Sequence, residues 1–232
     1  MLLTYLGHAG FMLEAGGATV LIDPWVTGNP VATTTADALH ADTILLSHAH
    51  NDHGIDDALA ISKRTGATII TTFELGEWLA TQGVTTVPAN PGGTVPFNGG
   101  SVKFTPAWHS SSYDTGAGTV VAAGIAAGLV IRFGSLKIYH TGDTALFRDM
   151  EFVGEEQIDL MCVCIGDHFT MGPVDATRAV GFVHPKTVIP MHYNTFPPIV
   201  QDGDAFKERV EAAVQGVRCY PLKPGQTHRF GE

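Results

Sequence analysis

The chain has 232 residues, 44% of them hydrophobic, which is enough for one large α/β domain or two small ones with a substantial core. It carries 13 basic and 23 acidic residues, a formal charge of −10, and no Lys/Arg cluster, so we expect no nucleic-acid partner. No apolar run approaches the roughly 20 residues of a membrane-spanning helix, and the N-terminus lacks the basic segment of a signal peptide. We therefore expect a cytoplasmic protein with a small-molecule partner and no membrane partner; formation of a homo-oligomer is left open.

Residues 1–41 are predicted to form a β-meander followed by a long loop. Strands are expected at 2–6, 11–15 and 19–23, separated by glycine-containing turns. The segment 25–41 is too long for a simple connector, so we place it at the mouth of a functional site.

Residues 47–54 read Ser-His-Ala-His-Asn-Asp-His-Gly and contain four side chains of metal-ligand type: His48, His50, Asp52 and His53. A buried strand is predicted before them at 42–47, and an amphipathic helix after them at 54–66. Alternate residues of an extended chain face the same side, so His48 and His50 can converge on one ion while Asp52 and His53 face a second position. A single histidine would more often be an ordinary surface residue, but this density indicates a metal site.

Strands and helices alternate in the remainder of the chain, without an internal repeat or linker, and we predict one domain over residues 1–232. Strands are expected at 68–72, 101–106, 129–133, 136–140, 160–165, 187–190 and 217–220, and helices at 73–82, 151–157, 175–183, where Asp175 is the expected cap, and 204–214. Turns before a hairpin are expected at 88–100. Cys162 and Cys164 lie on one face of a predicted strand, which favours buried free thiols over a disulfide or a metal site.

Three further ligand candidates, His109, Asp143 and His192, each follow a predicted strand. A catalytic metal site needs such ligands from the ends of separate strands. Taken alone, His109 would be an ordinary loop residue and Asp143 a turn former. Beside the cluster at 48–53, a ligand role is favoured for His109, and the carboxylate of Asp143 could bridge two ions.

Together these residues resemble the metallo-β-lactamase superfamily. Its His-x-His-x-Asp-His signature is matched by His48, His50, Asp52 and His53, its third histidine by His109, its bridging aspartate by Asp143 and its last histidine by His192. The motifs Tyr-Leu-Gly-His at 5–8, Ile-Asp-Pro at 22–24, Tyr-His-Thr-Gly-Asp-Thr at 139–144 and Pro-Met-His-Tyr at 190–193 look like the UPF0173 group of metal-dependent hydrolases. That group is related to the L-ascorbate-6-phosphate lactonase type, and the similarity extends over nearly the whole chain.

The resemblance implies an α/β fold of the αββα type, a four-layer sandwich in which two mixed sheets pack face to face with helices outside. It also implies two divalent metal ions. Zinc is the first choice, and manganese and iron are alternatives because imidazole and carboxylate suit all three. In that arrangement His48, His50 and His109 would hold the first ion, Asp52, His53 and His192 the second, and Asp143 would bridge them.

Two ions a few Å apart can activate a shared water, so we predict a metal-dependent hydrolase. The expected pocket loops carry aromatic residues, Trp25, Trp108, Phe169 and Phe196, which favour an ester, lactone or amide bond of a small molecule. A phosphodiesterase acting on a small phosphorylated or lipid-headgroup substrate is the alternative, and it would need Arg132 or Arg148 at the pocket. A non-catalytic metal-binding or sensing protein is a third hypothesis, which seven His and Asp ligands with open coordination argue against.

Catalysis also requires groups that protonate the leaving group and stabilise developing charge. The candidates that are not ligands are His8, His168 and Tyr193, with His168 preferred, and Asp52 is the candidate proton acceptor. His8 has an equally favoured alternative as a turn residue or a partner that fixes Asp23 or a ligand. The other histidines are expected to be structural or surface residues: His40, His140, His184 and His228.

Overall fold

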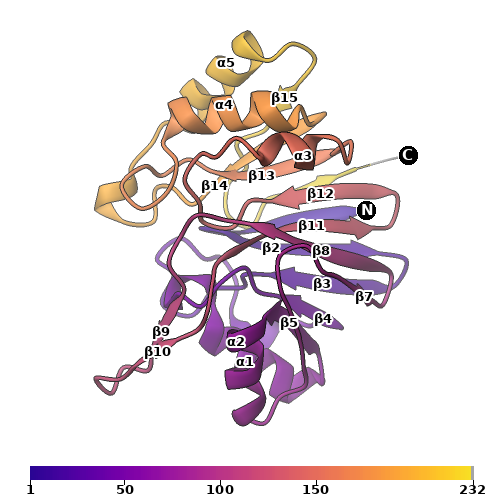
Figure 1. Ribbon diagram of the computed structural model, residues 1–232, viewed down its shortest axis with the longest axis vertical. Coiled ribbons are helices and arrows are strands. Elements are labelled where there is room, and N and C mark those ends of the chain that lie inside the picture. Colours follow the sequence, from indigo (N-terminus) through magenta and orange to yellow (C-terminus); the bar gives the residue numbers. More distant parts are fainter. Residues whose placement is uncertain (231–232) are drawn as a thin grey trace.

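The computed structural model describes residues 1–230, and its strands form two large sheets and a small ribbon. The first sheet contains β1 (Leu2–Gly7), β2 (Gly10–Ala15), β3 (Ala18–Ile22), β4 (Thr43–Leu45), β5 (Thr68–Thr72), β6 (Thr86–Ala89) and β16 (Thr227–Arg229). The second contains β7 (Thr94–Phe97), β8 (Gly100–Pro106), β11 (Ala127–Phe133), β12 (Leu136–His140), β13 (Leu160–Cys164), β14 (Thr187–Met191) and β15 (Arg218–Cys219). The ribbon of β9 (Ser112–Asp114) and β10 (Val120–Ala122) projects from the sandwich (Figure 1).

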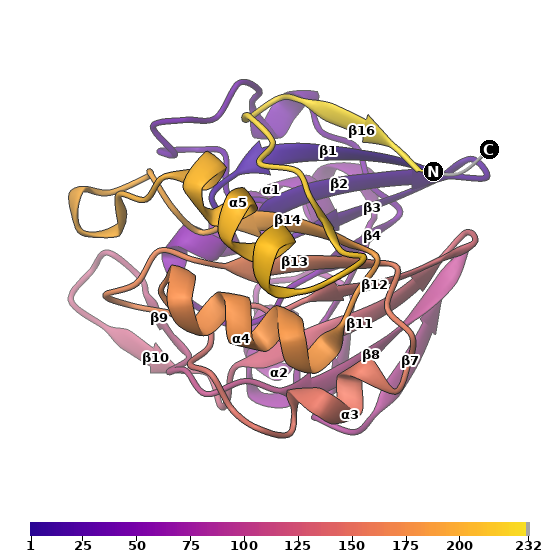
Figure 2. The same cartoon turned by 90° about the horizontal axis from the view of Figure 1, so that it is seen from above.

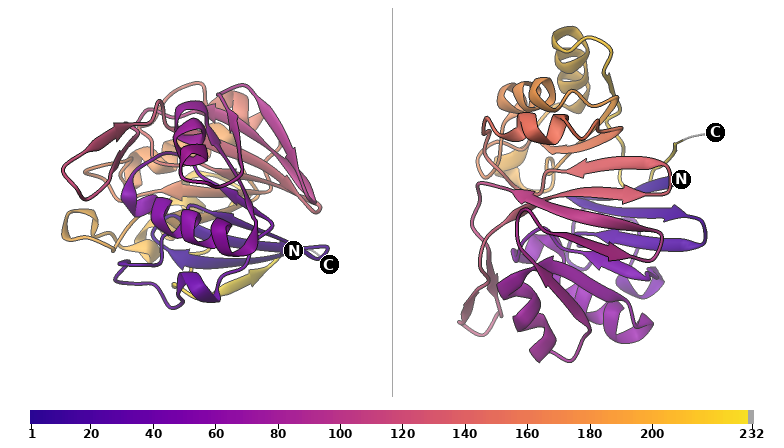
Figure 3. Two further views of the ribbon diagram at one scale, coloured as in Figure 1. Left: turned by 90° about the horizontal axis from the view of Figure 1, so that it is seen from below. Right: turned by 45° about the vertical axis from the view of Figure 1, so that its right-hand side comes forward.

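The helices lie outside the two sheets in two groups (Figures 1 and 2). On the side of the first sheet lie α1 (Ile55–Thr65) and α2 (Phe73–Thr81), which are in front in the view from below in Figure 3. On the side of the second lie α3 (Met150–Gly154), α4 (Pro173–Val183) and α5 (Gly203–Ala213), and short 3-10 turns occur at Ala36–Ala38, Asn51–His53 and Pro197–Ile199. Both sheets contain parallel and antiparallel pairs, so the predicted αββα sandwich of two mixed sheets is confirmed. No helix within residues 1–230 is both long and apolar enough to cross a membrane.

Alternating side chains allow the first sheet to be covered on both faces. In β3, Val20 and Ile22 belong to the core between the sheets, whereas Leu21 belongs to the cluster beneath α1 and α2. In β4, Leu45 faces the inner core and Ile44 the helices. Because neighbouring residues of a strand point to opposite faces, burial on both sides requires the continuous apolar runs that these strands show.

Strand direction explains why the ligand candidates gather at one end of the sandwich. Strands β3, β4 and β5 run parallel, as do β12, β13 and β14. Two successive antiparallel pairings give β1 the direction of β3, and β8 the direction of β12. The loops at the carboxyl ends of these strands, where open α/β sheets bind ligands, carry His8, Asp23, the cluster at 48–53, His109, Asp143 and His192.

Several short elements differ from the predictions. Strands β6 and β7 are edge strands that contain Pro88 and Pro96, which weakens the local strand pattern. Strands β9 and β10 are short and flank a glycine-rich turn, and they were not predicted. Strand β16 pairs with β1 from the far end of the sequence, so its position has no local signal. Helix α3 ends at Gly154, three residues early, and α4 begins at Pro173, so Asp175 lies in its first turn and is not its cap.

The prediction of buried free thiols is confirmed for Cys162 and Cys164. Burial raises the pKa of Cys164 to about 11, so this thiol stays protonated at neutral pH and is a poor nucleophile.

We expect Gly54→Ala to destabilise the protein more than Gly66→Ala, although both glycines have φ of +79°. The shared left-handed backbone makes both changes unfavourable by about 1–3 kcal/mol. A Cβ at Gly54 would also lie 2.5 Å from the Trp25 backbone N, whereas at Gly66 it would meet nothing within 4 Å. That clash should add about 1–3 kcal/mol to the loss of unfolding free energy, measured by urea denaturation. Equal losses in the two variants would show that the Trp25 backbone can move away without cost.

Candidate metal centre

A pocket of about 750 Å³ opens where the loops of the two sheets meet. Four ligand candidates line it: His50, Asp52, His109 and Asp143. Three aromatic residues from other loops line it as well: Trp25, Phe169 and Phe196. Trp25 begins the 25–41 loop, so the prediction that this loop reaches the site mouth is confirmed, whereas Trp108 is 69% exposed and is not among the lining residues.

The first group of possible ligands consists of His48, His50 and His109, as the sequence predicted. His50 Nδ1 lies 3.0 Å from His48 Nε2 and 3.2 Å from His109 Nε2. Burial lowers the pKa of all three imidazoles, which favours the neutral form that binds metal.

A chain of hydrogen bonds fixes the tautomer of His48. The Ser47 hydroxyl donates to Asp23 Oδ2 at 2.6 Å, so its oxygen accepts from His48 Nδ1 at 2.9 Å. The proton of His48 is therefore on Nδ1, and Nε2 presents a lone pair to the group. Ser47 was not singled out by sequence reasoning, because its role depends on a contact with Asp23 after a different strand.

Asp143 lies between the two groups of imidazoles. Its Oδ2 is 2.9 Å from His192 Nε2 and 3.3 Å from His53 Nε2, and it is also within 4 Å of two nitrogens of the first group, those of His48 and His109. Burial alone would raise the pKa of Asp143, but His192 and His53 hold it well below its ordinary value. The carboxylate is therefore ionised and central, in the position that a bridging ligand requires.

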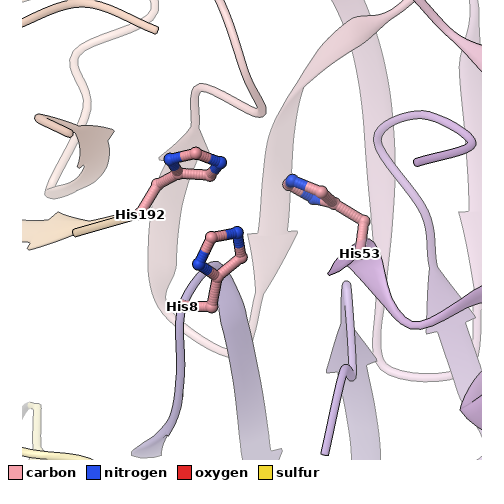
Figure 4. A group of neighbouring side chains, drawn as sticks. All are labelled: His8, His53 and His192. Atoms are coloured by element: carbon pink, nitrogen blue, oxygen red, sulfur yellow. The ribbon is translucent and has the colours of Figure 1, made fainter. Parts of the chain in front are cut away.

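The second group consists of His8, His53 and His192, whose rings turn toward one another in Figure 4. His53 donates from Nδ1 to Asp23 Oδ2 at 2.8 Å, which leaves Nε2 as the ligand atom. The sequence predicted Asp52 with His53 and His192 at this position. Asp52 is close by, with Oδ2 3.3 Å from His8 Nε2, so the structure brings the predicted residues together and adds His8.

Three residues of the centre have the left-handed backbone that is uncommon outside glycine: His8 (φ 55°), Asp23 (φ 40°) and His192 (φ 57°). The His192 N–H donates to the His8 carbonyl at 2.7 Å and so ties the loop after β14 to the loop after β1. Such backbone strain is typical of functional sites, where the surroundings maintain it.

Two further residues, which are not candidate ligands, hold the loops of the site in place. His140 donates from Nε2 to the Ala9 carbonyl at 2.9 Å and accepts from the Gly142 N–H at 3.1 Å, which fixes the turn before Asp143. Asp57 accepts from the backbone N–H groups of Val26 and Thr27 at 2.7 and 2.8 Å, which holds the loop that carries Trp25. Sequence reasoning missed Asp57, because an acidic residue in the first turn of a helix needs no other explanation.

The residues fit bound cations. Buried side-chain atoms without a hydrogen-bond partner include His8 Nε2, His53 Nε2, His192 Nδ1 and Asp143 Oδ1. Such atoms are rare in folded proteins, and each is unfavourable by about 1–3 kcal/mol. All four atoms belong to residues of the groups described above, and imidazole with carboxylate is a donor set for divalent transition metals.

Two predicted catalytic candidates lie away from the pocket lining. His168 is exposed and packs its ring edge-on to Phe169, with 4.4 Å between ring centroids. Its catalytic role stays a prediction. Tyr193 points its hydroxyl toward Gly203 at the start of α5, and burial raises its pKa to about 12. Its role at the substrate also stays a prediction.

Asp23→Asn is expected to weaken binding at both metal positions by about 10–100-fold, because Asp23 fixes His53 directly and His48 through Ser47. An amide in place of the carboxylate keeps the size but cannot accept all of the donated hydrogens. Competition with a chromogenic chelator would measure the change. Asp42→Asn is the matched control, since Asp42 also accepts a backbone N–H beside β3 but is exposed and lies away from the centre. Equal affinities in the two variants would contradict the role given to Asp23.

The chain matches proteins of known families. Residues 2–192 match a family model described as a beta-lactamase superfamily domain. A UPF0173 metal-dependent hydrolase of Thermus thermophilus is 48% identical over 226 residues, which is 97% of each chain. Another, of Pelotomaculum thermopropionicum, is 45% identical over 98% of this chain and 99% of its own. Among solved structures, Igni18, described as a novel metallo hydrolase from the hyperthermophilic archaeon Ignicoccus hospitalis, aligns with a TM-score of 0.88 at 38% identity and 99% coverage of both chains.

Proposed function

We propose that this chain, which belongs to the UPF0173 metal-dependent hydrolases of the metallo-β-lactamase superfamily, cleaves a carbon ester, lactone or amide bond in an uncharged small molecule. The observation that carries this proposal is the charge of the pocket. Carboxylates of four aspartates line it, those of Asp52, Asp56, Asp57 and Asp143, and no Lys or Arg does. A phosphate would therefore find no side-chain cation of Lys or Arg in that lining.

In this proposal His48, His50 and His109 would hold one divalent ion, His53, His192 and Asp52 would hold a second, and Asp143 would serve both. Zinc is the first choice of metal, with manganese or iron as alternatives. When bound, the ions supply a water of lowered pKa and polarise the oxygen of the bond under attack.

The protein's own residues would bind and orient the substrate. Trp25 and Phe196 stack with 5.7 Å between ring centroids, and Phe169 is 52% exposed on another loop, so an apolar substituent could pack against these rings. Asp57 holds the Trp25 loop in place. Asp52 lines the pocket with its side chain 27% exposed and is the candidate proton acceptor there.

Phosphodiester hydrolysis is less well supported. Arg132 pairs with Glu156 at 2.7 Å, and Arg148 pairs with Glu151 at 2.7 Å and lies over the Phe182 ring. Neither arginine lines the pocket. A charged phosphoryl group would therefore lack the side-chain cations that usually bind it.

The proposal is tested with purified protein loaded with Zn²⁺ or Mn²⁺. We expect kcat/KM for an uncharged aryl ester or lactone to exceed that for bis-p-nitrophenyl phosphate by at least about 100-fold, which corresponds to about 2.7 kcal/mol of transition-state stabilisation. The comparison should hold with either metal. Faster turnover of the phosphodiester would favour the alternative, and metal binding without turnover of any substrate class would favour a sensing role.

A further inference from the structure

We propose that His8 is an additional protein ligand of the second metal position, beside Asp52, His53 and His192. This inference rests on the proposed function only in requiring that an ion binds there, and it does not depend on which bond is cleaved. His8 lies in the turn after β1, outside the signature that identifies the other ligands.

The position of one ring nitrogen supports this role. His8 is completely buried, and its Nε2 has no hydrogen-bond partner. That atom lies 3.3 Å from Asp52 Oδ2, and His8 contributes a nitrogen that is within 4.8 Å of nitrogens of both His53 and His192. Figure 4 shows the three rings converging from separate loops. Two ligand atoms that are each about 2.1 Å from one ion lie up to about 4 Å apart, so the 3.3 Å between His8 Nε2 and Asp52 Oδ2 fits a shared ion.

Hydrogen bonding at the other ring nitrogen fits a ligand tautomer. Thr195 Oγ1 lies 2.9 Å from His8 Nδ1 and donates to the Tyr193 carbonyl at 3.4 Å. A hydroxyl that donates its hydrogen to a carbonyl accepts one from Nδ1–H, which leaves a lone pair on Nε2. Histidines that bind metals usually donate their other N–H to such an acceptor. His48 and His53 have the same arrangement with Ser47 and Asp23.

The surroundings hold His8 in this orientation. Its ring packs edge-on to Trp25 and Phe196, with 5.2 and 5.6 Å between centroids, and lies 4.1 Å from the ring of His192. Its carbonyl accepts from the Tyr5 hydroxyl at 2.9 Å and from the His192 N–H at 2.7 Å. These contacts maintain a left-handed backbone (φ 55°) that is otherwise unfavourable for a residue other than glycine.

A consequence is that the two metal positions differ. The first would have four protein ligands, His48, His50, His109 and the shared Asp143, which suits the tetrahedral preference of zinc. The second would have five, because His8 joins Asp52, His53, His192 and Asp143. With a water it becomes six-coordinate, a geometry that manganese or iron accepts more readily than zinc.

The alternative role for His8 is a hydrogen bond to Asp52 without contact to the ion. That role needs the proton on Nε2, and it can be separated from ligation by substitution. His8→Gln places an amide N–H near Asp52 but removes the imidazole, and His8→Ala removes both functions. His40→Ala is the matched control, because His40 is exposed and distant from the centre.

The experiment titrates the full-length metal-free proteins with Co²⁺, whose visible absorption is strong in four-coordinate sites and weak in six-coordinate ones. Wild type and His40→Ala should bind two ions, one strongly and one weakly absorbing. Both His8 variants should bind the weakly absorbing ion at least about 100-fold less tightly, since loss of an outer-shell partner alone reduces affinity about 10–100-fold.

Near-wild-type affinity and spectrum in His8→Gln would overturn the proposal and assign His8 to positioning Asp52. Two strongly absorbing sites in wild type would also overturn it. Circular dichroism of the metal-free proteins checks folding, and if His8→Ala does not fold, the Gln variant carries the comparison. Preference for a phosphodiester in the substrate panel would overturn the proposed function while leaving this metal result unaffected.

Discussion

Asp143→Ala is expected to abolish hydrolysis and to lower the metal content from two ions toward one or none. Oδ2 of Asp143 is the atom nearest to both groups of imidazoles, at 2.9 Å from His192 Nε2 and 3.6 Å from His109 Nε2. Its removal takes a buried negative charge from the point where two divalent cations would meet. Metal ions stabilise the transition state by several kcal/mol, and each 1.36 kcal/mol is tenfold in rate, so kcat/KM should fall by at least about 1,000-fold.

Two further variants test whether the loss is specific to the charge of Asp143. Asp143→Asn keeps the size of the side chain and should show the same loss, which separates the charge from packing. Asp149 lies in the same segment, is exposed and makes no side-chain cap to α3. The variant Asp149→Ala should therefore keep both metals and activity. Elemental analysis and steady-state kinetics measure the outcome. Two tightly bound ions in Asp143→Ala would show that the ligand assignment is wrong.

The positions of the ligand candidates could be predicted from the sequence because each depends on local chemistry. The cluster at 48–53 stands out by composition, and His109, Asp143 and His192 each follow a recognisable apolar strand. Strands that run in one direction bring their carboxyl ends to one edge of a sheet, but these candidates come from two sheets. The strand ends identified the candidates, and the resemblance to the metallo-β-lactamase superfamily supplied the expectation that they meet at one site.

The role of His8 could not be predicted in the same way. It depends on the loop after β1 meeting the loop after β14, where the His192 N–H donates to the His8 carbonyl, and on a hydrogen bond to Thr195. Both contacts join residues that are more than 180 positions apart in the sequence. Strand periodicity says nothing about how two sheets are placed against each other, so the sequence left His8 open between a catalytic group and a turn residue or a partner that fixes Asp23 or a ligand.

The predicted catalytic role of His168 gains no support from the structure, for a related reason. It follows the buried strand β13 as the ligands follow theirs, but its left-handed backbone (φ 48°) is part of a turn after which Phe169, and not His168, lines the pocket. A strand end identifies which loop reaches the site. The side-chain direction within that loop depends on a few backbone torsions that the residue types do not determine.

Removing the metals is expected to lower the thermal stability of the protein as well as its activity. The centre contains unpartnered buried atoms from loops of both sheets, among them His53 Nε2 and Asp143 Oδ1, and imidazoles held close together. An ion present at 1,000 times its Kd stabilises the folded state by about 4.1 kcal/mol if it does not bind the unfolded chain. For a chain of this length, 1 kcal/mol corresponds to about 2–4 °C, so loss of one such ion in a chelator should lower Tm by about 8–16 °C, and loss of both by about twice as much.

Calorimetry of the protein with a chelator, and again after Zn²⁺ or Mn²⁺ is restored, measures this shift. Asp143→Ala supplies the control, because its Tm should respond much less to the chelator if Asp143 contacts both ions. The thiols of Cys162, Cys164 and Cys219 are buried and should not contribute. An unchanged Tm after elemental analysis confirms metal removal would mean that the buried centre is stable without cations, and that its imidazoles and carboxylates satisfy one another.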